Sequence, residues 1–221
     1  SWFAGPNTTV KGVVSRGYRN PTMRELYMWV PKNPDLDPED LMNYEVSASQ
    51  HFMGRRLAVE VNLYYIKGEN SIVQARVADP EDPGETVVRY TNTGSIENYG
   101  MELSANYIVS PRLNINANYS YLHMERETAA SPKHKAYIGA DYSIKKWVFS
   151  TGLQYVGDLV TQAEDKISGL PLLEDSFLLW NARVSYRAAK WLDVFVRGEN
   201  LLGQSYEMYH GYPMPGATVF G

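Results

Sequence analysis

The feature that most constrains the fold of this chain is a two-residue alternation of apolar and polar side chains, which recurs in segment after segment. Residues 113–121 show it most clearly, because apolar or aromatic residues alternate there with Asn114, Asn116, Asn118 and Ser120. Successive side chains of a β-strand point to opposite faces of the sheet. Each such segment is therefore predicted to be a strand with one apolar and one polar face, and the chain to be all-β.

The same alternation predicts about ten strands, most of them roughly 10 to 14 residues long. They are expected at 8–16, 42–52, 57–65, 98–109, 113–121, 135–144, 147–158, 178–187, 192–199 and 217–220. Every second connection is a tight turn, at Gly54-Arg55, Ser110-Pro111-Arg112, Lys145-Lys146 and Ala188-Ala189-Lys190. The other connections are long, among them a polar loop at 78–84 and a segment rich in Gly, Pro and Tyr that runs to Pro215.

Two architectures produce such alternation, an antiparallel transmembrane β-barrel and a soluble β-sheet that binds a ligand or partner. The polar faces are rich in charge and amide groups, and Tyr and Trp gather near the ends of the apolar faces. Both features, together with the alternation of short and long connections, favour the barrel. On this interpretation Val194 faces lipid and Asn116 faces an aqueous lumen.

Composition excludes several classes of protein. No run approaches the roughly 18 consecutive apolar residues of a membrane-spanning helix, and the mean hydropathy of −0.38 is compatible with a barrel. The net charge of −4 offers no broad basic surface, so nucleic acid is not an expected partner. The absence of cysteine excludes disulfides and thiolate metal sites.

Short motifs extend over nearly the whole chain. The first is Tyr18-Arg19-Asn20-Pro21-Thr22-Met23-Arg24-Glu25-Leu26-Tyr27, which is followed by Asn33-Pro34-Asp35-Leu36-Asp37-Pro38-Glu39 and Asn43-Tyr44-Glu45. Later matches are Gly100-Met101-Glu102 and Gly198-Glu199-Asn200-Leu201-Leu202. With these motifs the chain resembles the TonB-dependent receptors. The residues that carry the resemblance are Arg19, Pro21, Glu25, Tyr27, Asn33, Pro34, Leu36, Pro38, Glu39, Tyr44, Glu45, Gly100, Glu102, Asn200 and Leu201.

The resemblance implies both an architecture and a function. Such receptors have a barrel of about 22 strands around an N-terminal plug, so residues 1–221 are expected to be the C-terminal portion of the barrel domain, without the plug and the N-terminal strands. The implied location is the outer membrane of a Gram-negative bacterium, in contact with outer-membrane lipid. The implied activity is import of a scarce nutrient, such as an iron–siderophore complex, cobalamin or a glycan, powered by the TonB complex acting through the plug. Neither a cofactor nor chemistry on the substrate is implied.

Three details refine the resemblance. The family often has Arg after the glycine at the position of Gly216, but Ala217 stands here. Haem receptors tend to place a His between the two opening motifs, whereas 18–36 contains none, and this disfavours haem. Glu45 and Glu102 are expected to point into the lumen beside Arg or Lys from neighbouring strands.

Substrate contacts are expected on the long loops and in the upper lumen. The candidates are Tyr27, Trp29, His134, Tyr209, His210 and Tyr212. Aromatic rings there can stack on a chelate or a sugar, or can instead pack within folded loops or join an interfacial belt. The four histidines, His51, His123, His134 and His210, show no metal-ligand spacing, so no metal site is predicted.

An outer-membrane protease with Asp and His at its rim is the enzymatic alternative. Asp141 and His123 could be neighbours on adjacent strands. However, Asp141 falls on a polar face and His123 on an apolar face, so their side chains are predicted to point apart. No nucleophile, zinc or phosphate-loop motif occurs. The chain is therefore predicted not to be an enzyme, and no catalytic residue is assigned.

Overall fold

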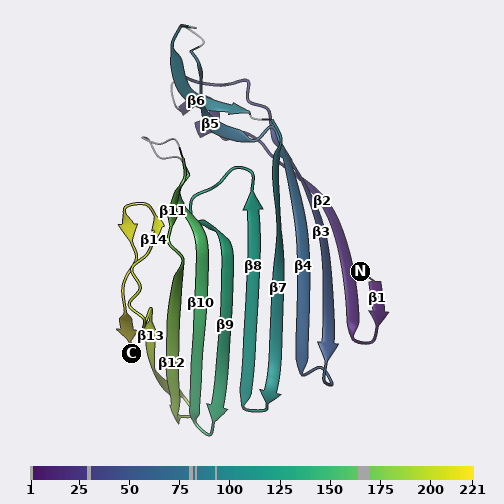
Figure 1. The fold of residues 1–221 in the computed structure, drawn as a ribbon, viewed down its shortest axis with the longest axis vertical. Helices are drawn as coiled ribbons and strands as arrows, with labels where there is room; N and C mark the ends of the chain where they lie inside the picture. Colours follow the sequence, from purple (N-terminus) through teal and green to yellow (C-terminus); the bar gives the residue numbers. More distant parts are fainter. Residues whose placement is uncertain (1, 29–30, 80–81, 83, 93, 164–169) are drawn as a thin grey trace. The chain divides into compact units, whose positions relative to one another are not determined.

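The computed structural model describes residues 2–28, 31–79, 82, 84–92, 94–163 and 170–221, and it is built almost entirely of β-strands (Figure 1). Within these residues a one-turn π-helix, η1 (Arg24–Met28), is the helical element. No helix of the described part is long and apolar enough to cross a membrane. The strands are β1 (Trp2–Gly5), β2 (Thr8–Arg19), β3 (Glu39–Phe52), β4 (Leu57–Glu69), β5 (Ile72–Ala78), β6 (Thr86–Asn92), β7 (Ile96–Ser110), β8 (Leu113–Met124), β9 (Ser131–Ile144), β10 (Trp147–Gln162), β11 (Leu172–Glu174), β12 (Phe177–Ala189), β13 (Leu192–Glu199), β14 (Glu207–Tyr209), β15 (Tyr212–Pro213) and β16 (Thr218–Phe220).

Pairing between neighbours joins most of these strands into one sheet. Its order is β1-β2-β3-β4-β7-β8-β9-β10-β12-β13-β16, and β11 pairs with β10. Strands adjacent in this order follow one another along the chain apart from the short strands outside it, so the sheet is an antiparallel meander. The predicted all-β class and each of the ten predicted segments are confirmed. The short strands β1 and β11 were not predicted.

Two small hairpins lie outside this sheet. Strands β5 and β6 pair from Ile72↔Asn92 to Ala78↔Thr86, and β14 pairs with β15. Neither hairpin was predicted from the sequence, where a polar loop was expected at 78–84 and an irregular segment up to Pro215. Strand β5 ends at Ala78 and β6 begins at Thr86, and residues 80, 81 and 83 of the expected loop lie outside the described residues. The tight turn after β12 also falls slightly later than expected, at Lys190–Trp191, because Ala188 and Ala189 still belong to the strand.

The chain divides into two compact units. The larger contains Ser1–Lys11, Val46–Leu63 and Gly100–Gly221, and the smaller contains Gly12–Glu45 and Tyr64–Tyr99. Strands β8 to β13 belong wholly to the larger unit, whereas η1 and the β5–β6 hairpin belong to the smaller one.

Strand register in the larger unit keeps the two kinds of side chain on separate faces. One row of paired residues across β8, β9, β10, β12 and β13 is polar throughout: Asn114, Asp141, Ser150, Arg183 and Arg197. The adjacent row points to the other face and is apolar: Leu113, Tyr142, Phe149, Val184 and Val196. Since side chains alternate along every strand, the polar and apolar faces are each continuous over five strands.

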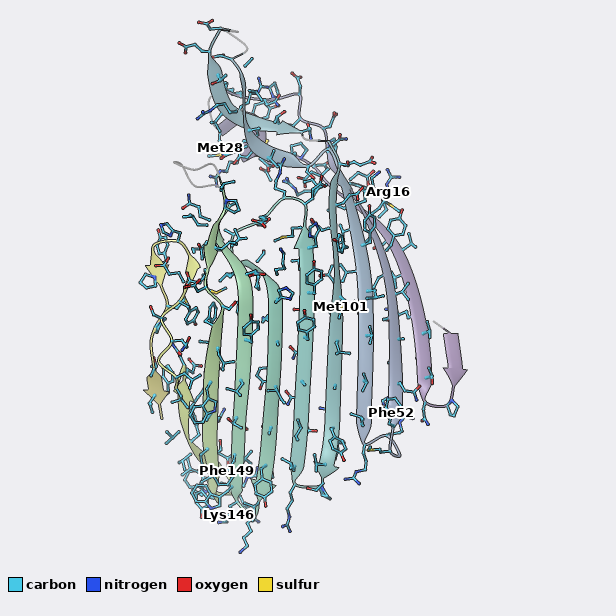
Figure 2. All side chains as sticks on the ribbon, in the orientation of Figure 1. Arg16, Met28, Phe52, Met101, Lys146 and Phe149 are labelled. Carbon is cyan, nitrogen blue, oxygen red and sulfur yellow. The ribbon has the colours of Figure 1, made fainter. Side chains whose placement is uncertain are left out.

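No second layer formed by the described residues covers the apolar face. Ile138 is 52% exposed, Val194 47% and Phe149 41%, and Figure 2 shows the side chains projecting freely from the sheet. A soluble β-sandwich would bury this face under a second sheet. A continuous exposed apolar surface of this size indicates contact with a membrane or with another protein. The soluble-sheet alternative is therefore not supported.

Aromatic side chains border the apolar face in two belts. Near the tight turns, the Trp147 ring centroid lies 4.5 Å from that of Tyr186 and 6.1 Å from that of Phe149. Toward the other end of the sheet lie Tyr121 in β8 and Tyr155 in β10. Tyr155 lies eight positions after Trp147, about 27 Å along an extended strand. With a tilt of about 40°, that length covers about 21 Å along the membrane normal, most of an apolar band of about 25 Å. Val194 pairs with Tyr186 and therefore lies in the belt near the turns, not mid-strand.

Tyr137 covers a pair of glycines on the polar face. Gly139 and Gly152 are partners across β9 and β10, and a Cβ built on Gly152 would lie 2.5 Å from the Tyr137 hydroxyl oxygen. The two glycines thus provide the space that the tyrosine ring fills. The ring shields backbone that would otherwise be bare, as aromatic residues do over strand glycines elsewhere.

Candidate functional site

The opening motif forms an ion-pair network in the smaller unit. Arg19, at the end of β2, donates from Nε to Glu39 at 2.6 Å and from Nη1 to Glu25 at 2.9 Å. The Glu25 carboxylate also accepts hydrogen bonds from the backbone N–H and the hydroxyl of Thr22, at 2.7 and 2.8 Å. Glu39 in turn accepts the backbone N–H of Ile72 at 2.7 Å. Arg19 therefore ties η1, β3 and the start of the β5–β6 hairpin together.

This arrangement changes the acidity of Glu25. The hydrogen bonds from the Arg19 guanidinium, aided by those from Thr22 and by the charge of Arg19, lower the pKa of Glu25 from 4.5 to about 2. A carboxylate held by a cation and several donors is favoured over its protonated form. Glu25 is thus a structural carboxylate and not a proton carrier near neutral pH.

The second motif attaches to the β5–β6 hairpin. Asn33 is 9% exposed, and its side-chain amide donates to the backbone carbonyl of Tyr90 at 2.8 Å. Asn92 accepts the backbone N–H of Asp37 and donates to the carbonyls of Asp37 and Asn70 at 2.9 and 2.6 Å. Leu36 is also buried, whereas Pro34 and Pro38 are exposed. The motif therefore fixes the shape of the connection between β2 and β3.

The remaining motif residues lie within strands. Tyr44 is exposed on β3, and its ring centroid lies 6.2 Å from that of Tyr65. Gly100 is buried in β7. Neither Glu45 nor Glu102 makes an ion pair with Arg or Lys within the described part of the chain. Glu102 does line a hollow of the polar face together with Lys135, Glu60 and Asn118. No ion pair is needed there, since the hollow is open to water.

The last motif fixes the base of the loop between β13 and β16. Asn200 is 5% exposed, and its side-chain amide donates to the carbonyls of Gln204 and Pro215 at 2.8 and 3.1 Å. Its side-chain oxygen accepts the backbone N–H of Gln204 at 2.9 Å. Leu201 packs against Gly198, where an added Cβ would lie 2.6 Å from the Leu201 side chain. Both ends of the loop are thus held by one side chain.

Above this base, the segment that carries β14 and β15 packs onto β10 and β12. The rings of Tyr206 and Phe177 stack with centroids 4.3 Å apart, beside the buried Val156 and Leu159. Two backbone donors add to the attachment: the N–H of Glu207 to Glu174 at 3.3 Å, and the N–H of His210 to the carbonyl of Thr161 at 3.2 Å. The loop is therefore a folded structure with its own small core.

The hairpin displays three of the six predicted substrate-binding residues together. Tyr209 in β14 pairs with Tyr212 in β15, and His210 lies in the turn between them. Tyr209 is 54% and Tyr212 73% exposed, so both rings are open to a ligand. His210 Nδ1 lies 3.7 Å from Glu207 Oε2, and that oxygen also accepts the N–H of Gly211 at 2.8 Å. The hairpin thus offers an exposed aromatic surface on a fixed base.

The other three predicted residues are not part of this surface. Tyr27 lies in η1 of the smaller unit and is exposed, and Trp29 lies outside the described residues. His134 lies within β9, not on a loop, and its Nδ1 is 2.8 Å from the Tyr119 hydroxyl oxygen. Its ring is also 5.2 Å from that of Tyr121 between centroids, so it belongs with the aromatic residues of the apolar face. Sequence spacing placed the start of β9 at Lys135, four residues late.

Among the described residues, neither a metal site nor the Asp–His pair of the protease hypothesis is formed. No group of three His, Cys, Asp or Glu side chains there is placed to hold a metal ion. Asp141 accepts a hydrogen bond from Ser150 at 2.5 Å and pairs across the sheet with Asn114. His123 lies nine residues from Asn114 along β8, about 30 Å away. The Asp–His pair that a rim protease would need is therefore not formed.

The signal for the hairpin's anchoring residues was weak in the sequence. Tyr206, Phe177 and Glu174 were not singled out, because they lie on segments far apart in the chain. The single available cue was that Tyr206 lies within a long loop rich in Gly, Pro and Tyr, and this did not identify the partner ring.

Comparison with known proteins places these features in a family. The family described as TonB dependent receptor-like, beta-barrel matches residues 1–201. An iron-regulated outer membrane virulence protein of Vibrio cholerae serotype O1 is 28% identical over 142 residues, covering 58% of this chain and 22% of that protein. The vitamin B12 transporter BtuB of Photobacterium profundum is 26% identical over 199 residues, covering 86% of this chain and 30% of the transporter.

Solved structures agree on the fold. The copper transporter OprC superposes with a TM-score of 0.79 at 17% identity, over 97% of this chain and 37% of the transporter. The chain thus spans well under half the length of each of these proteins.

Proposed function

The chain belongs to the TonB dependent receptor-like β-barrel family, and from this premise we propose that it forms part of a receptor that binds a scarce nutrient and imports it across the outer membrane. The location is the outer membrane of a Gram-negative bacterium. The observation that supports the proposal most directly is the pair of continuous faces over β8 to β13, one polar and one apolar and exposed. A wall between lipid and an aqueous lumen needs that arrangement.

The substrate class proposed is a metal chelate, with an iron–siderophore complex first and cobalamin second. The relatives named for iron regulation and for vitamin B12 transport support these two classes. A glycan is the third class. Energy for import is proposed to come from the TonB complex, acting through a plug domain. Because the family is one of receptors and transporters, the rim protease is dropped.

Within this function, the hairpin surface of Tyr209, His210 and Tyr212 is the proposed substrate contact. Exposed aromatic rings on a rigid base bind flat or cyclic ligands with little loss of side-chain entropy. The base is rigid here because Asn200 and the Tyr206–Phe177 stack hold it.

Growth of a strain that lacks the full-length receptor tests the proposal. The strain is supplied in turn with single ferric siderophores, with cobalamin and with defined glycans as the limiting nutrient, and the receptor gene is restored as the control. The expected result is a growth defect on one nutrient, rescued by the receptor and not by a receptor unable to engage TonB. Equal growth with and without the receptor on every nutrient contradicts the proposal, as does rescue that is independent of TonB.

A further inference from the structure

Basic residues gather on the tight turns at one end of the sheet in the larger unit. Arg55 and Arg56 lie in the β3–β4 turn, Arg112 in the β7–β8 turn, Lys145 and Lys146 in the β9–β10 turn, and Lys190 in the β12–β13 turn. Because neighbouring strands alternate in direction, these turns all fall at the same end, as Figure 1 shows along the lower edge and as the label of Lys146 marks in Figure 2. The turns therefore form a row of positive charge.

This row has almost no compensating acid. None of the turn segments 53–56, 110–112, 145–146 and 190–191 contains Asp or Glu. The first carboxylate after the β12–β13 turn, Asp193, lies 3.4 Å from Arg187 and forms an ion pair with it. The long connections of the same unit do contain acids: Glu125 and Glu127 flank Arg126 after β8, and Glu174 and Asp175 precede β12. Within the larger unit, the end of the sheet with the tight turns is therefore the basic end, although the net charge of the chain is −4.

Two of the cations are held by the sheet itself. The Arg56 guanidinium donates to the carbonyls of Ile108, at 3.0 Å, and Val109. Lys146 Nζ lies 5.8 Å from the centroid of the Tyr186 ring, and 3.5 Å from the carbonyl oxygen of Ala188. This places the Lys146 ammonium beside the aromatic belt of the apolar face, as long cationic side chains do where lipid meets water.

The other four cations are exposed. Within the described residues none of Arg55, Arg112, Lys145 and Lys190 makes an ion pair. Aromatic side chains stand between them, with Trp147 43% and Trp191 83% exposed. We call these four cations, with Lys146, Trp147 and Trp191, the turn-end rim.

We propose that the turn-end rim binds the phosphate groups of anionic phospholipids in the membrane leaflet that meets the tight turns. Successive turns are two strand spacings apart, about 10 Å, so the rim presents its charges as a line along the end of the sheet. Lys145 and Lys146 also border a hollow that contains Arg183, Arg187 and the carboxylate of Asp193. A line of single cations beside exposed indole rings matches a planar array of headgroups above acyl chains. This interaction is separate from substrate import and does not depend on it.

Lipid selectivity of the full-length receptor tests the proposal. The receptor is reconstituted in mixed phosphatidylcholine and phosphatidylglycerol bilayers, and the association of spin-labelled forms of each lipid with the protein is compared. The expected preference for phosphatidylglycerol is about fivefold or more at low salt, and it falls as salt is added. Equal association of the two lipids would overturn the proposal.

Two variants that each lose four positive charges distinguish the effect of the rim from the effect of the overall charge of the protein. The rim variant carries Arg55→Gln, Arg112→Gln, Lys145→Gln and Lys190→Gln, and the control carries Lys32→Gln, Arg76→Gln, Arg89→Gln and Lys133→Gln, which lie off the rim. The rim variant is expected to lose the preference and the control to keep it. Loss in both variants, or retention in the rim variant, overturns the proposal. If the rim variant does not fold, as judged by its gel mobility before and after boiling, the pair Lys145→Gln and Lys190→Gln is compared with Arg76→Gln and Arg89→Gln under the same criteria.

Discussion

The side-chain amide nitrogen of Asn200 lies 3.1 Å from the backbone carbonyl oxygen of Pro215, and this hydrogen bond closes a loop of fifteen residues. Asn200 is nearly buried and has a positive φ of 47°, which Asn tolerates better than most residues. The same amide holds Gln204. The motif Gly198–Leu202 therefore fixes the conformation of the loop that follows it.

Replacement of Asn200 by Ala is expected to loosen this loop. Two backbone carbonyls and one N–H lose a buried partner, a cost of roughly 1–3 kcal/mol for each group left unsatisfied. Limited proteolysis of the folded receptor should show new cleavage within 201–216, with the barrel otherwise intact. Asn106→Ala, in an exposed position of β7, is the matched control and should leave the digestion pattern unchanged. An uncut loop in the Asn200 variant would contradict the role assigned to the amide.

The two faces of the sheet predict opposite tolerance for charge. Ile138 is near the middle of β9 on the apolar face, and Asn116 lies at nearly the same level on the polar face, paired with Gly139. Ile138→Arg should reduce the free energy of membrane folding by about 2–4 kcal/mol, whereas Val194→Arg in the turn-end belt should cost about 0–1 kcal/mol. Asn116→Arg should be as mild as Val194→Arg. Urea titrations in lipid vesicles measure all three, and equal costs for Ile138→Arg and Asn116→Arg would refute the assignment of faces.

Sequence reasoning was reliable where a structural feature depends on local periodicity. The alternation around Asn114, Asn116 and Asn118 predicted β8 and its polar face, because facing in a strand needs only the positions of neighbours along the chain. The β5–β6 hairpin was missed since it is fixed from far away, as by the bond from Asn33 to Tyr90 over 57 residues. No periodicity encodes such a contact.

The candidate site shows the same division. Tyr209, His210 and Tyr212 were predicted from composition and do lie together, because they are close in sequence. The Tyr206 ring stacks on the Phe177 ring and holds this hairpin in place. The two residues belong to segments far apart in the chain, so the contact could not be predicted from the sequence of either segment. His134 was predicted to lie on a loop because the alternation of apolar and polar residues begins only at Lys135, whereas β9 begins at Ser131.

Tyr137 and Gly152 are expected to be energetically coupled. Gly152→Ala would drive a methyl group into the Tyr137 ring, so it should cost roughly 1–3 kcal/mol. Tyr137→Ala uncovers the glycine backbone and should also destabilise the barrel. In the double variant the added methyl meets no ring, so the combined loss should be smaller than the sum of the two. A double-mutant cycle in urea measures the coupling, and additive costs would show that the ring does not occupy this space.

Acid should loosen the segment that η1 anchors. The pKa of Glu25 is lowered in the folded protein from 4.5 to about 2. The stabilisation from the charged carboxylate is therefore complete above the unfolded pKa and is lost as pH falls through the folded value. Hydrogen exchange of a peptide covering 20–28, corrected for intrinsic rates, should rise between about pH 4 and about pH 2. Glu25→Gln should exchange faster at neutral pH and lose this dependence, whereas Asp35→Asn, exposed in the same connection, should behave as the parent does. A parent profile that stays flat down to the lowest pH would contradict the network.

The hairpin tyrosines give the last and most direct prediction about binding. If Tyr209 and Tyr212 stack on the substrate, replacement of both by Ala should raise the dissociation constant by about 30-fold, the loss typical of an aromatic hot spot of about 2 kcal/mol. Calorimetry with the nutrient identified by the growth assay measures it in the full-length receptor. The matched control is Tyr142→Ala with Tyr186→Ala, which removes two rings from the turn-end part of the apolar face. The hairpin variant should keep the protease resistance of the loop, since its anchors are Tyr206 and Asn200 and neither is altered. Unchanged affinity with an intact loop would remove the hairpin from the binding surface and leave the transport proposal standing on the fold alone.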